Sequence, residues 1–241
     1  MDKAIVAAAM FAIPVLLLVV GFRIAGRRVR YKPLFWAAFA FATYMLLLRS
    51  RGVIPEPAFL ETLQLNWLGK ALSILGTCVL LALVPGVSFR AAGVRWEQAT
   101  GSVRSVTIVG VVTILGATIT AAAVSPSPNT SLEWLAFQAT MPGLDEELFL
   151  RGLLLLLFHQ AFGRGLTVAG AETGWGLWLT TLLFGLLHGV TVQGDEISIN
   201  VAAIVLTGFV GFVAGWMRER TGSLVAPVVF HNAFNVAQSF V

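Results

Sequence analysis

Apolar runs of about 15–21 residues recur along the whole chain, and they constrain the fold more than any other feature. A run of this length can cross the hydrocarbon core of a bilayer as a helix. Hydrophobic residues make up 57% of the 241 residues and charged residues only 12%, against about 25% charged in an average soluble domain. A soluble protein of this size has no core large enough to bury so many apolar side chains. The sequence therefore predicts a polytopic membrane protein.

We expect an all-α fold: a polytopic helix bundle with about eight transmembrane helices, in a single integral membrane domain over residues 1–241. The first apolar run is too long for a signal peptide, and its basic cluster follows it, so we expect a retained anchor helix. The predicted spans are 4–22, 34–48, 67–85, 105–124, 144–162, 175–192, 197–217 and 223–241.

The distribution of lysine and arginine predicts the orientation, because loops on the cytoplasmic side carry an excess of both. With the N-terminus outside, the outer loops hold only Lys3, Arg49 and Arg51. This bias favours a multi-pass protein of the cell membrane with both termini outside. It also means that the basic residues are better explained by membrane orientation than by a nucleic-acid-binding face. The inner loops would hold Arg23, Arg27, Arg28, Arg30, Lys32, Arg90, Arg95, Arg104, Arg164, Arg218 and Arg220.

Charged side chains inside a bilayer are costly and are usually paired or functional. The single cysteine, Cys78, lies within an apolar run and excludes a disulfide framework or a cysteine-based metal site. Most of the ionisable residues within the predicted spans fall in the last hundred residues of the chain. They are Lys70, Asp145, Glu146, Glu147, Arg151, His159, His188 and His231.

The fifth predicted span opens with three consecutive acids. On a helix Glu147 and Arg151 are four residues apart and can pair on one face. Glu146 points about 100° away and has no such partner in its own helix, so it can face the bundle interior. The structural alternative is an acidic helix N-terminus, favoured by the helix dipole and closed by a local salt bridge.

Two later spans carry histidines. Phe184 and His188 share a face of the sixth span, and a membrane histidine can also serve only as an interhelical hydrogen-bonding group. In the last span His231 and Asn235 are four residues apart and project from one face, whereas Asn232 points elsewhere, towards a packing or capping role.

Two chemistries are open to this set of residues. A carboxylate and an imidazole can hold and deprotonate a water, while a second imidazole and an amide donate hydrogen bonds to the oxyanion of a tetrahedral intermediate. Alternatively, Glu146, His188 and His231 could be three ligands of a Zn²⁺ ion with one position left open. The residues alone do not decide between them.

The three motifs Glu146-Glu147-xxx-Arg151, Phe184-xxx-His188 and His231-xxx-Asn235, in this order, resemble those of the CPBP intramembrane proteases. This family includes the CAAX prenyl endopeptidases and the bacterial Abi or bacteriocin-processing proteins. The run from Arg220 to Pro227 also looks like the family's lead-in to its last histidine. The resemblance covers about residues 140–238, the expected catalytic core, and leaves residues 1–135 as N-terminal helices.

The resemblance implies an eight-helix bundle with a buried peptidase site for membrane-bound peptide or protein substrates. By analogy Glu146 activates water with help from His188, and His231 and Asn235 stabilise the oxyanion. Glu147, Arg151 and Phe184 match structural positions of the motifs. The family has been described both as metalloproteases and as metal-free glutamate proteases. We expect no cofactor, because Asn235 suits oxyanion stabilisation better than zinc ligation, with Zn²⁺ as the alternative.

Other classes of membrane protease fit the sequence less well. The site-2 type of zinc protease needs His-Glu-x-x-His, which the sequence lacks. The only Gly-x-Ser lies at the end of a span, which argues against a rhomboid protease. A presenilin-type protease would need a second aspartate within the membrane, which the sequence lacks. A non-proteolytic membrane factor, such as a bacteriocin immunity or sorting protein, stays open as an alternative, as does a small transporter or proton relay. His159 matches no motif, and we expect a structural role near the inner interface.

Overall fold

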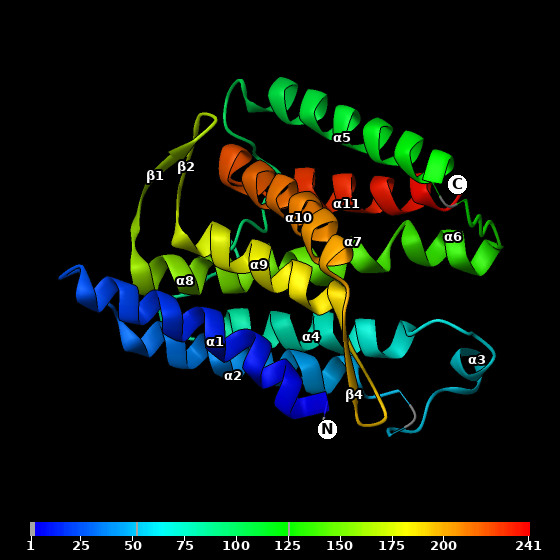
Figure 1. The fold of residues 1–241 in the computed structure, drawn as a ribbon, viewed down its shortest axis with the longest axis horizontal. Helices are drawn as coiled ribbons and strands as arrows, with labels where there is room; N and C mark the ends of the chain where they lie inside the picture. Colours follow the sequence, from blue (N-terminus) through cyan, green and yellow to red (C-terminus); the bar gives the residue numbers. More distant parts are fainter. Residues whose placement is uncertain (1–2, 52, 125) are drawn as a thin grey trace.

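The computed structural model describes residues 3–51, 53–124 and 126–241, which form a mostly helical bundle (Figure 1). The α-helices are α1 (Lys3–Ile24), α2 (Tyr31–Leu48), α3 (Ala58–Glu61), α4 (Trp67–Leu83), α5 (Ser102–Val124), α6 (Leu132–Gln138), α7 (Met141–Glu146), α8 (Leu155–Phe162), α9 (Trp175–Gly189), α10 (Val201–Thr221) and α11 (Val225–Gln238). A π-helix, η1 (Glu147–Leu154), joins α7 to α8. The strands are β1 (Arg164–Val168), β2 (Ala171–Gly174), β3 (Val190–Gln193) and β4 (Glu196–Ile199).

Every predicted span is helical over most of its length, although 175–192 runs into β3 and 197–217 begins in β4, and the mostly helical fold is confirmed. Among the described residues, α1, α2, α5 and α10 are long and apolar enough to cross a membrane, and α4 and α9 are shorter apolar helices. The fifth predicted span consists of α7, η1 and α8 in succession. The count of eight transmembrane helices therefore stays a prediction.

Two antiparallel hairpins depart from the all-α expectation, and each links two helices through a two-residue turn. In the hairpin β1–β2, the turn residues Ala169 and Gly170 both have positive φ, of 46° and 75°, as a type I′ turn requires. In β3–β4 the turn begins with Gly194 at φ 57°. The strands are only four or five residues long, too short to stand out beside long apolar helices.

Asparagine caps fix the start of two helices that carry site residues or pack against them. The Asn66 side chain accepts a hydrogen bond from the Gly69 amide at 3.1 Å at the start of α4. The Asn200 side chain does the same for the Ala203 amide at 3.0 Å at the start of α10. Each cap satisfies an amide that the helix itself leaves unpaired. The lengths of these helices are thus set by local sequence as well as by their apolar runs.

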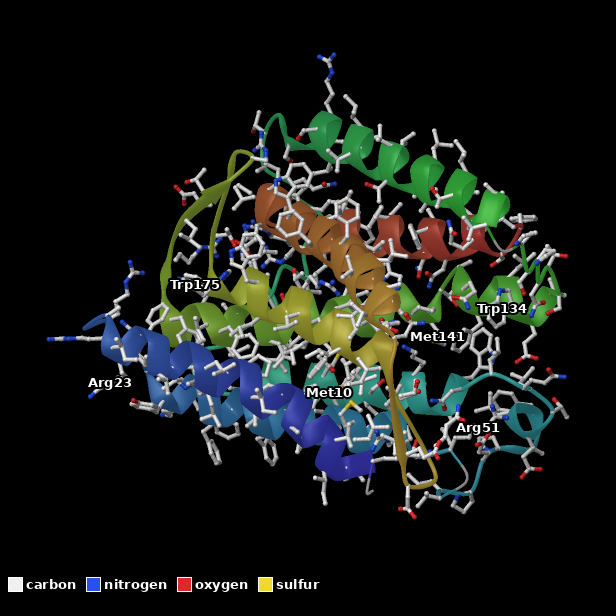
Figure 2. All side chains as sticks on the ribbon, in the orientation of Figure 1. Met10, Arg23, Arg51, Trp134, Met141 and Trp175 are labelled. Carbon is white, nitrogen blue, oxygen red and sulfur yellow. The ribbon has the colours of Figure 1, made fainter. Side chains whose placement is uncertain are left out.

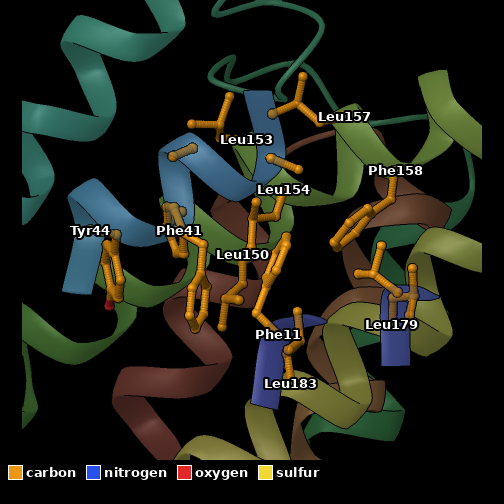
Figure 3. Close-up of a cluster of buried hydrophobic side chains, with 14 of the residues drawn as sticks. Phe11, Phe41, Tyr44, Leu150, Leu153, Leu154, Leu157, Phe158, Leu179 and Leu183 are labelled. Carbon is orange, nitrogen blue, oxygen red and sulfur yellow. The ribbon is translucent and has the colours of Figure 1, made fainter. Parts of the chain in front are cut away.

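The segment α7–η1–α8 runs through the middle of the bundle, with α2 and α4 on one side and α10 and α11 on the other (Figure 1). Most of its leucines are almost completely buried against aromatic rings from α1 and α2, and Figure 3 shows this cluster. Phe11 stacks on Phe41 at 4.8 Å and on Phe158 at 6.0 Å between ring centroids. A helix that is apolar all round is a buried one. The acidic residues of this segment are therefore held inside the protein.

Basic loops gather at one end of the bundle. The turn between α1 and α2, the loop between α4 and α5 and the hairpin β1–β2 all lie at this end (Figure 1). Figure 2 shows Arg23 and Trp175 at this end and Arg51 and Trp134 at the opposite end. The loops predicted to lie inside thus share one end of the molecule. The side of the membrane that this end faces stays a prediction.

Candidate active site

Asp145 is fully buried and is the best-satisfied of the three consecutive acids. The Tyr44 hydroxyl donates to its Oδ2 at 2.8 Å, and the Ser73 hydroxyl donates to its Oδ1 at 2.5 Å. The ammonium of Lys70 lies 2.8 Å from Oδ2. Buried charges are tolerated when they are paired and hydrogen-bonded in this way. Asp145 therefore anchors the junction of α7 and η1 to α2 and α4.

Glu146 faces the bundle interior, and its side chain is 15% exposed. Lys70 Nζ lies 2.6 Å from its Oε1. Its second oxygen, Oε2, lies 3.9 Å from Nε2 of His188 on α9. That separation is too long for a direct hydrogen bond. The carboxylate is thus fixed by α4 on one side and faces an imidazole nitrogen on the other.

The protonation of His188 follows from its other ring nitrogen. Nδ1 lies 2.8 Å from the carbonyl oxygen of Phe184. Because a carbonyl oxygen can only accept, Nδ1 carries a proton and donates it. In the neutral ring Nε2 is then an acceptor. The His188 side chain is 38% exposed, so this acceptor is accessible to water.

Glu147 and Arg151 form the predicted pair, with Nη1 3.1 Å from Oε1 and both side chains fully buried. The same Glu147 oxygen lies 2.7 Å from Nδ1 of His231 on α11. Arg151 Nη2 also donates to the carbonyl of Gly211 at 2.8 Å, which ties η1 to α10. His231 is therefore positioned by the second glutamate of the motif and keeps its Nε2 free of this contact.

Phe184 lies at the centre of the histidines and the arginine. The guanidinium carbon of Arg151 lies 4.5 Å from the centroid of its ring, a cation–π distance. Its ring contacts the imidazole of His188 at 4.4 Å and that of His231, edge to face, at 5.8 Å. The aromatic residue of the second motif thus holds side chains of the first and third motifs together.

The two asparagines of α11 have different surroundings. The Asn232 side chain accepts from the Gly143 amide at 2.8 Å and donates to the Thr140 carbonyl at 3.3 Å, so it fastens the first turn of α7, as the expected capping role requires. The Asn235 amide has no hydrogen-bond partner in the described part of the chain, and it lines a cavity of about 230 Å³ together with Trp134. The expected hydrogen bond from Asn235 to the oxyanion of the intermediate stays a prediction.

Sequence reasoning found Lys70 and Asp145 as charges within spans but not as partners, and it did not single out Tyr44 or Ser73. One signal was present in the sequence. Polar residues on α4 repeat at Lys70, Ser73 and Thr77, which lie on one face of the helix and are all buried. A polar stripe on an otherwise apolar helix indicates a buried polar partner elsewhere in the chain.

His159 lies away from these residues, at the end of α8 next to β1. Its Nδ1 is 3.5 Å from Arg164 and 3.8 Å from a carboxylate oxygen of Glu219. Arg164 and Glu219 are themselves an ion pair. Because the basic loops gather at this end, the position of His159 agrees with a structural role near the predicted inner interface.

Residues 128–237 match a family model described as type II CAAX prenyl endopeptidase Rce1-like. The predicted resemblance to the CAAX proteases is confirmed. The matched segment runs from the residues before α6 to the end of α11 and contains every residue of the three motifs. Neither the comparison with curated proteins nor that with solved structures gave a match.

Three of the residues that hold the acidic motif lie outside the Rce1-like segment. Tyr44 is on α2, and Lys70 and Ser73 are on α4, yet all three contact Asp145 or Glu146. The N-terminal helices therefore complete the surroundings of the Rce1-like motif.

The expected metal ligands Glu146, His188 and His231 come from three separate helical elements. Among the described residues, no group of three or more His, Cys, Asp or Glu side chains has the geometry of a metal site. Glu146 shares its Oε1 with the Lys70 ammonium. An ammonium 2.6 Å from a ligand oxygen opposes the binding of a dication there. The ion pair with Lys70 therefore disfavours a zinc ion at Glu146, and the expectation that no cofactor is needed stays a prediction.

Proposed function

We propose that the protein is an intramembrane endopeptidase that hydrolyses peptide bonds of membrane-associated substrates, prenylated CAAX-type C-termini among them. The observation that carries the proposal is the position of Glu146 opposite His188, with Oε2 and Nε2 3.9 Å apart. The substrate class comes from the description of the Rce1-like family. The protein would act as a multi-pass component of the cell membrane, with eight spans and the bilayer around it.

The attacking water would lie between Glu146 and His188. Both Oε2 and the Nε2 of neutral His188 are acceptors, so one water can donate its two protons to the two side chains. The Lys70 ammonium holds Oε1 of Glu146, so only Oε2 of this carboxylate faces the water. His188 would therefore share in removing the proton as the water attacks the scissile carbonyl.

The oxyanion formed by this attack would be stabilised from α11. Donation from His231 requires a proton on Nε2, while Nδ1 is engaged with the Glu147 carboxylate at 2.7 Å. The Glu147–His231 pair must then hold two protons, one in the Nδ1–Oε1 hydrogen bond and one on Nε2. Asn235, one helical turn further, supplies an amide donor that has no partner among the described residues. Such donors stabilise the developing charge of the intermediate.

We propose that the reaction proceeds without a metal ion. The ion pair of Lys70 with Glu146 supports this, since an ammonium next to Oε1 repels a dication there. A non-proteolytic membrane factor is the second candidate. It is favoured by the same ion pair, which gives Glu146 a structural partner independent of any reaction.

A cleavage assay separates the two candidates. The full-length protein, purified in detergent, is incubated with CAAX peptides with and without a prenyl group, beside Glu146→Gln and the exposed control Glu97→Gln. We expect cleavage by the wild type and Glu97→Gln and none by Glu146→Gln. Equal cleavage by all three proteins would contradict the assignment of Glu146, and folded wild type that cleaves no peptide would favour the non-proteolytic candidate.

The same assay with a chelator tests the metal-free part of the proposal. We expect unchanged cleavage in the presence of EDTA or 1,10-phenanthroline. Loss of cleavage that added Zn²⁺ restores would contradict it and would favour the alternative in which Glu146, His188 and His231 are zinc ligands.

A further inference from the structure

A basic pocket of about 450 Å³ lies at the end of the bundle where the basic loops gather. It is formed by the loop between α4 and α5, the start of β1, the last turn of α10 and the residue that follows it, Gly222. Its charged lining residues are Arg90, Arg95, Arg164, Arg218 and Glu219. The candidate active site lies on other elements, at the junction of α7 and η1.

Three of the four arginines have no carboxylate partner in the described part of the chain. Glu219 pairs with Arg164. Arg218 uses Nε and Nη2 on the carbonyls of Ala92 and Ala91, which closes the wall of the pocket. A carbonyl is neutral, so these contacts do not compensate the charge of Arg218, and the single carboxylate of Glu219 acts on both Arg164 and Arg218. The pocket therefore holds an excess of positive charge.

Guanidinium donors remain available towards the pocket. Arg95 uses only Nε, on the Gly222 carbonyl at 2.8 Å, so its two terminal nitrogens have no acceptor among the described residues. The exposed side chain of Arg90 likewise has no hydrogen-bond partner there. Guanidinium groups present paired N–H donors that match the oxygens of a phosphate group. A phosphate-bearing anion would supply both the missing charge and the missing acceptors.

The loop that carries Arg90 and Arg95 also exposes large apolar side chains. Phe89 precedes Arg90, and Val94 and Trp96 flank Arg95, with exposed fractions of 38%, 43% and 84%. Aromatic and basic residues that alternate on an exposed loop are typical of the boundary between lipid headgroups and acyl chains. This pattern favours a phospholipid over a soluble phosphate as the source of the anion.

We propose that this pocket binds the phosphate group of an anionic phospholipid. Arginines on the headgroup side would hold the phosphate, while Phe89, Val94 and Trp96 contact the acyl region. Arg95 and Arg218 already join the loop between α4 and α5 to the end of α10, so a bound lipid would brace this junction. The proposal is independent of the peptidase function.

Lipid binding to the purified full-length protein tests the proposal. Dioctanoyl phosphatidylglycerol, dioctanoyl phosphatidylcholine and inorganic phosphate are titrated separately, and adducts are counted by native mass spectrometry. The variant is Arg90→Ala, whose side chain makes no hydrogen bond or ion pair with another described residue. The matched control is Arg28→Ala, an exposed arginine at the same end but outside the pocket.

We expect one saturable phosphatidylglycerol site with affinity about fivefold lower in Arg90→Ala, since each arginine near an anionic lipid contributes about that factor. Arg28→Ala should bind like the wild type. Equal losses in both variants, or equal binding of phosphatidylcholine, would overturn the proposal. If inorganic phosphate binds as tightly as phosphatidylglycerol, the proposal that the bound phosphate belongs to a lipid would be overturned.

Discussion

Lys70 and Glu146 form an ion pair with Nζ 2.6 Å from Oε1, although 76 positions separate them in the sequence. The same ammonium lies 2.8 Å from Asp145. One lysine on α4 therefore compensates two adjacent acids on the central helical segment. This relationship joins the N-terminal helices to the Rce1-like segment and fixes the carboxylate that we propose as the water-activating group.

Replacing Lys70 by methionine should destabilise the protein by about 3–5 kcal/mol, because it leaves Asp145 and Glu146 as buried charges without a cation. Thermal unfolding in detergent measures this change, with the exposed Lys32→Met as the control. Adding Asp145→Asn to Lys70→Met should restore part of the loss, because one of the two unpaired charges is removed. A Tm of Lys70→Met equal to that of the wild type would contradict the structural role of the pair.

The Glu147–Arg151 pair should behave as a unit. Glu147→Gln alone should lower the free energy of unfolding by about 3–5 kcal/mol, because Arg151 is then a fully buried cation without its carboxylate. The double variant Glu147→Gln/Arg151→Met should be more stable than Glu147→Gln alone, since no unpaired charge remains. Strictly additive losses in this double-mutant cycle would argue against the pair.

Asn235 and Asn232 provide a matched comparison on one helix. Asn235→Ala should lower kcat by about 10²–10³-fold with little change in unfolding temperature, the expected loss for one oxyanion donor. Asn232→Ala should instead lower stability by about 1 kcal/mol, because it removes an acceptor from the first turn of α7. Steady-state kinetics and thermal unfolding of both variants separate the two roles. Unchanged kcat in Asn235→Ala would exclude it from the reaction.

The carboxylate of Glu133, outside the predicted spans, predicts a pH dependence of stability. The amides of Leu65 and Gln64 both donate to its Oε1 at 2.9 Å, and these hydrogen bonds hold the pKa of Glu133 below its usual value. A lowered pKa in the folded state stabilises the protein above the unfolded pKa of about 4.3, and the contribution is lost as the pH falls through the lowered value.

Thermal unfolding of Glu133→Gln from neutral to acidic pH measures this contribution. We expect the variant to be less stable than the wild type at neutral pH and to converge with it in acid. The exposed control Glu97→Gln should follow the wild type at every pH. A constant difference between Glu133→Gln and the wild type across the range would assign the effect to packing rather than to charge.

Local patterns predicted much of this molecule. The apolar runs located the helices, and the four-residue spacing of Glu147 and Arg151 predicted their contact, because such neighbours meet on any helix. Asn232 was expected to cap or pack, and it fastens the first turn of α7. Each of these inferences depended only on residues within one turn or one apolar run.

The remainder depended on contacts between distant segments. The spacing on α4 shows a polar stripe, but no local rule pairs Lys70 with Glu146 across 76 positions. The partner of His231 is Glu147, which could not be deduced because it depends on how α11 packs beside α7, just before η1. The hairpins were missed because their strands are too short to show an alternating pattern. These contacts are set by tertiary packing, and the spacing of residues along one helix does not predict them.

Hydrolysis in H₂¹⁸O tests most directly whether Glu146 activates a water. The wild type should release a peptide whose new carboxylate carries one ¹⁸O atom, and Glu146→Gln should release none, because its amide cannot accept the proton of the water. Mass spectrometry of the product measures both outcomes. Labelled product from Glu146→Gln at the wild-type rate would contradict the central role of Glu146.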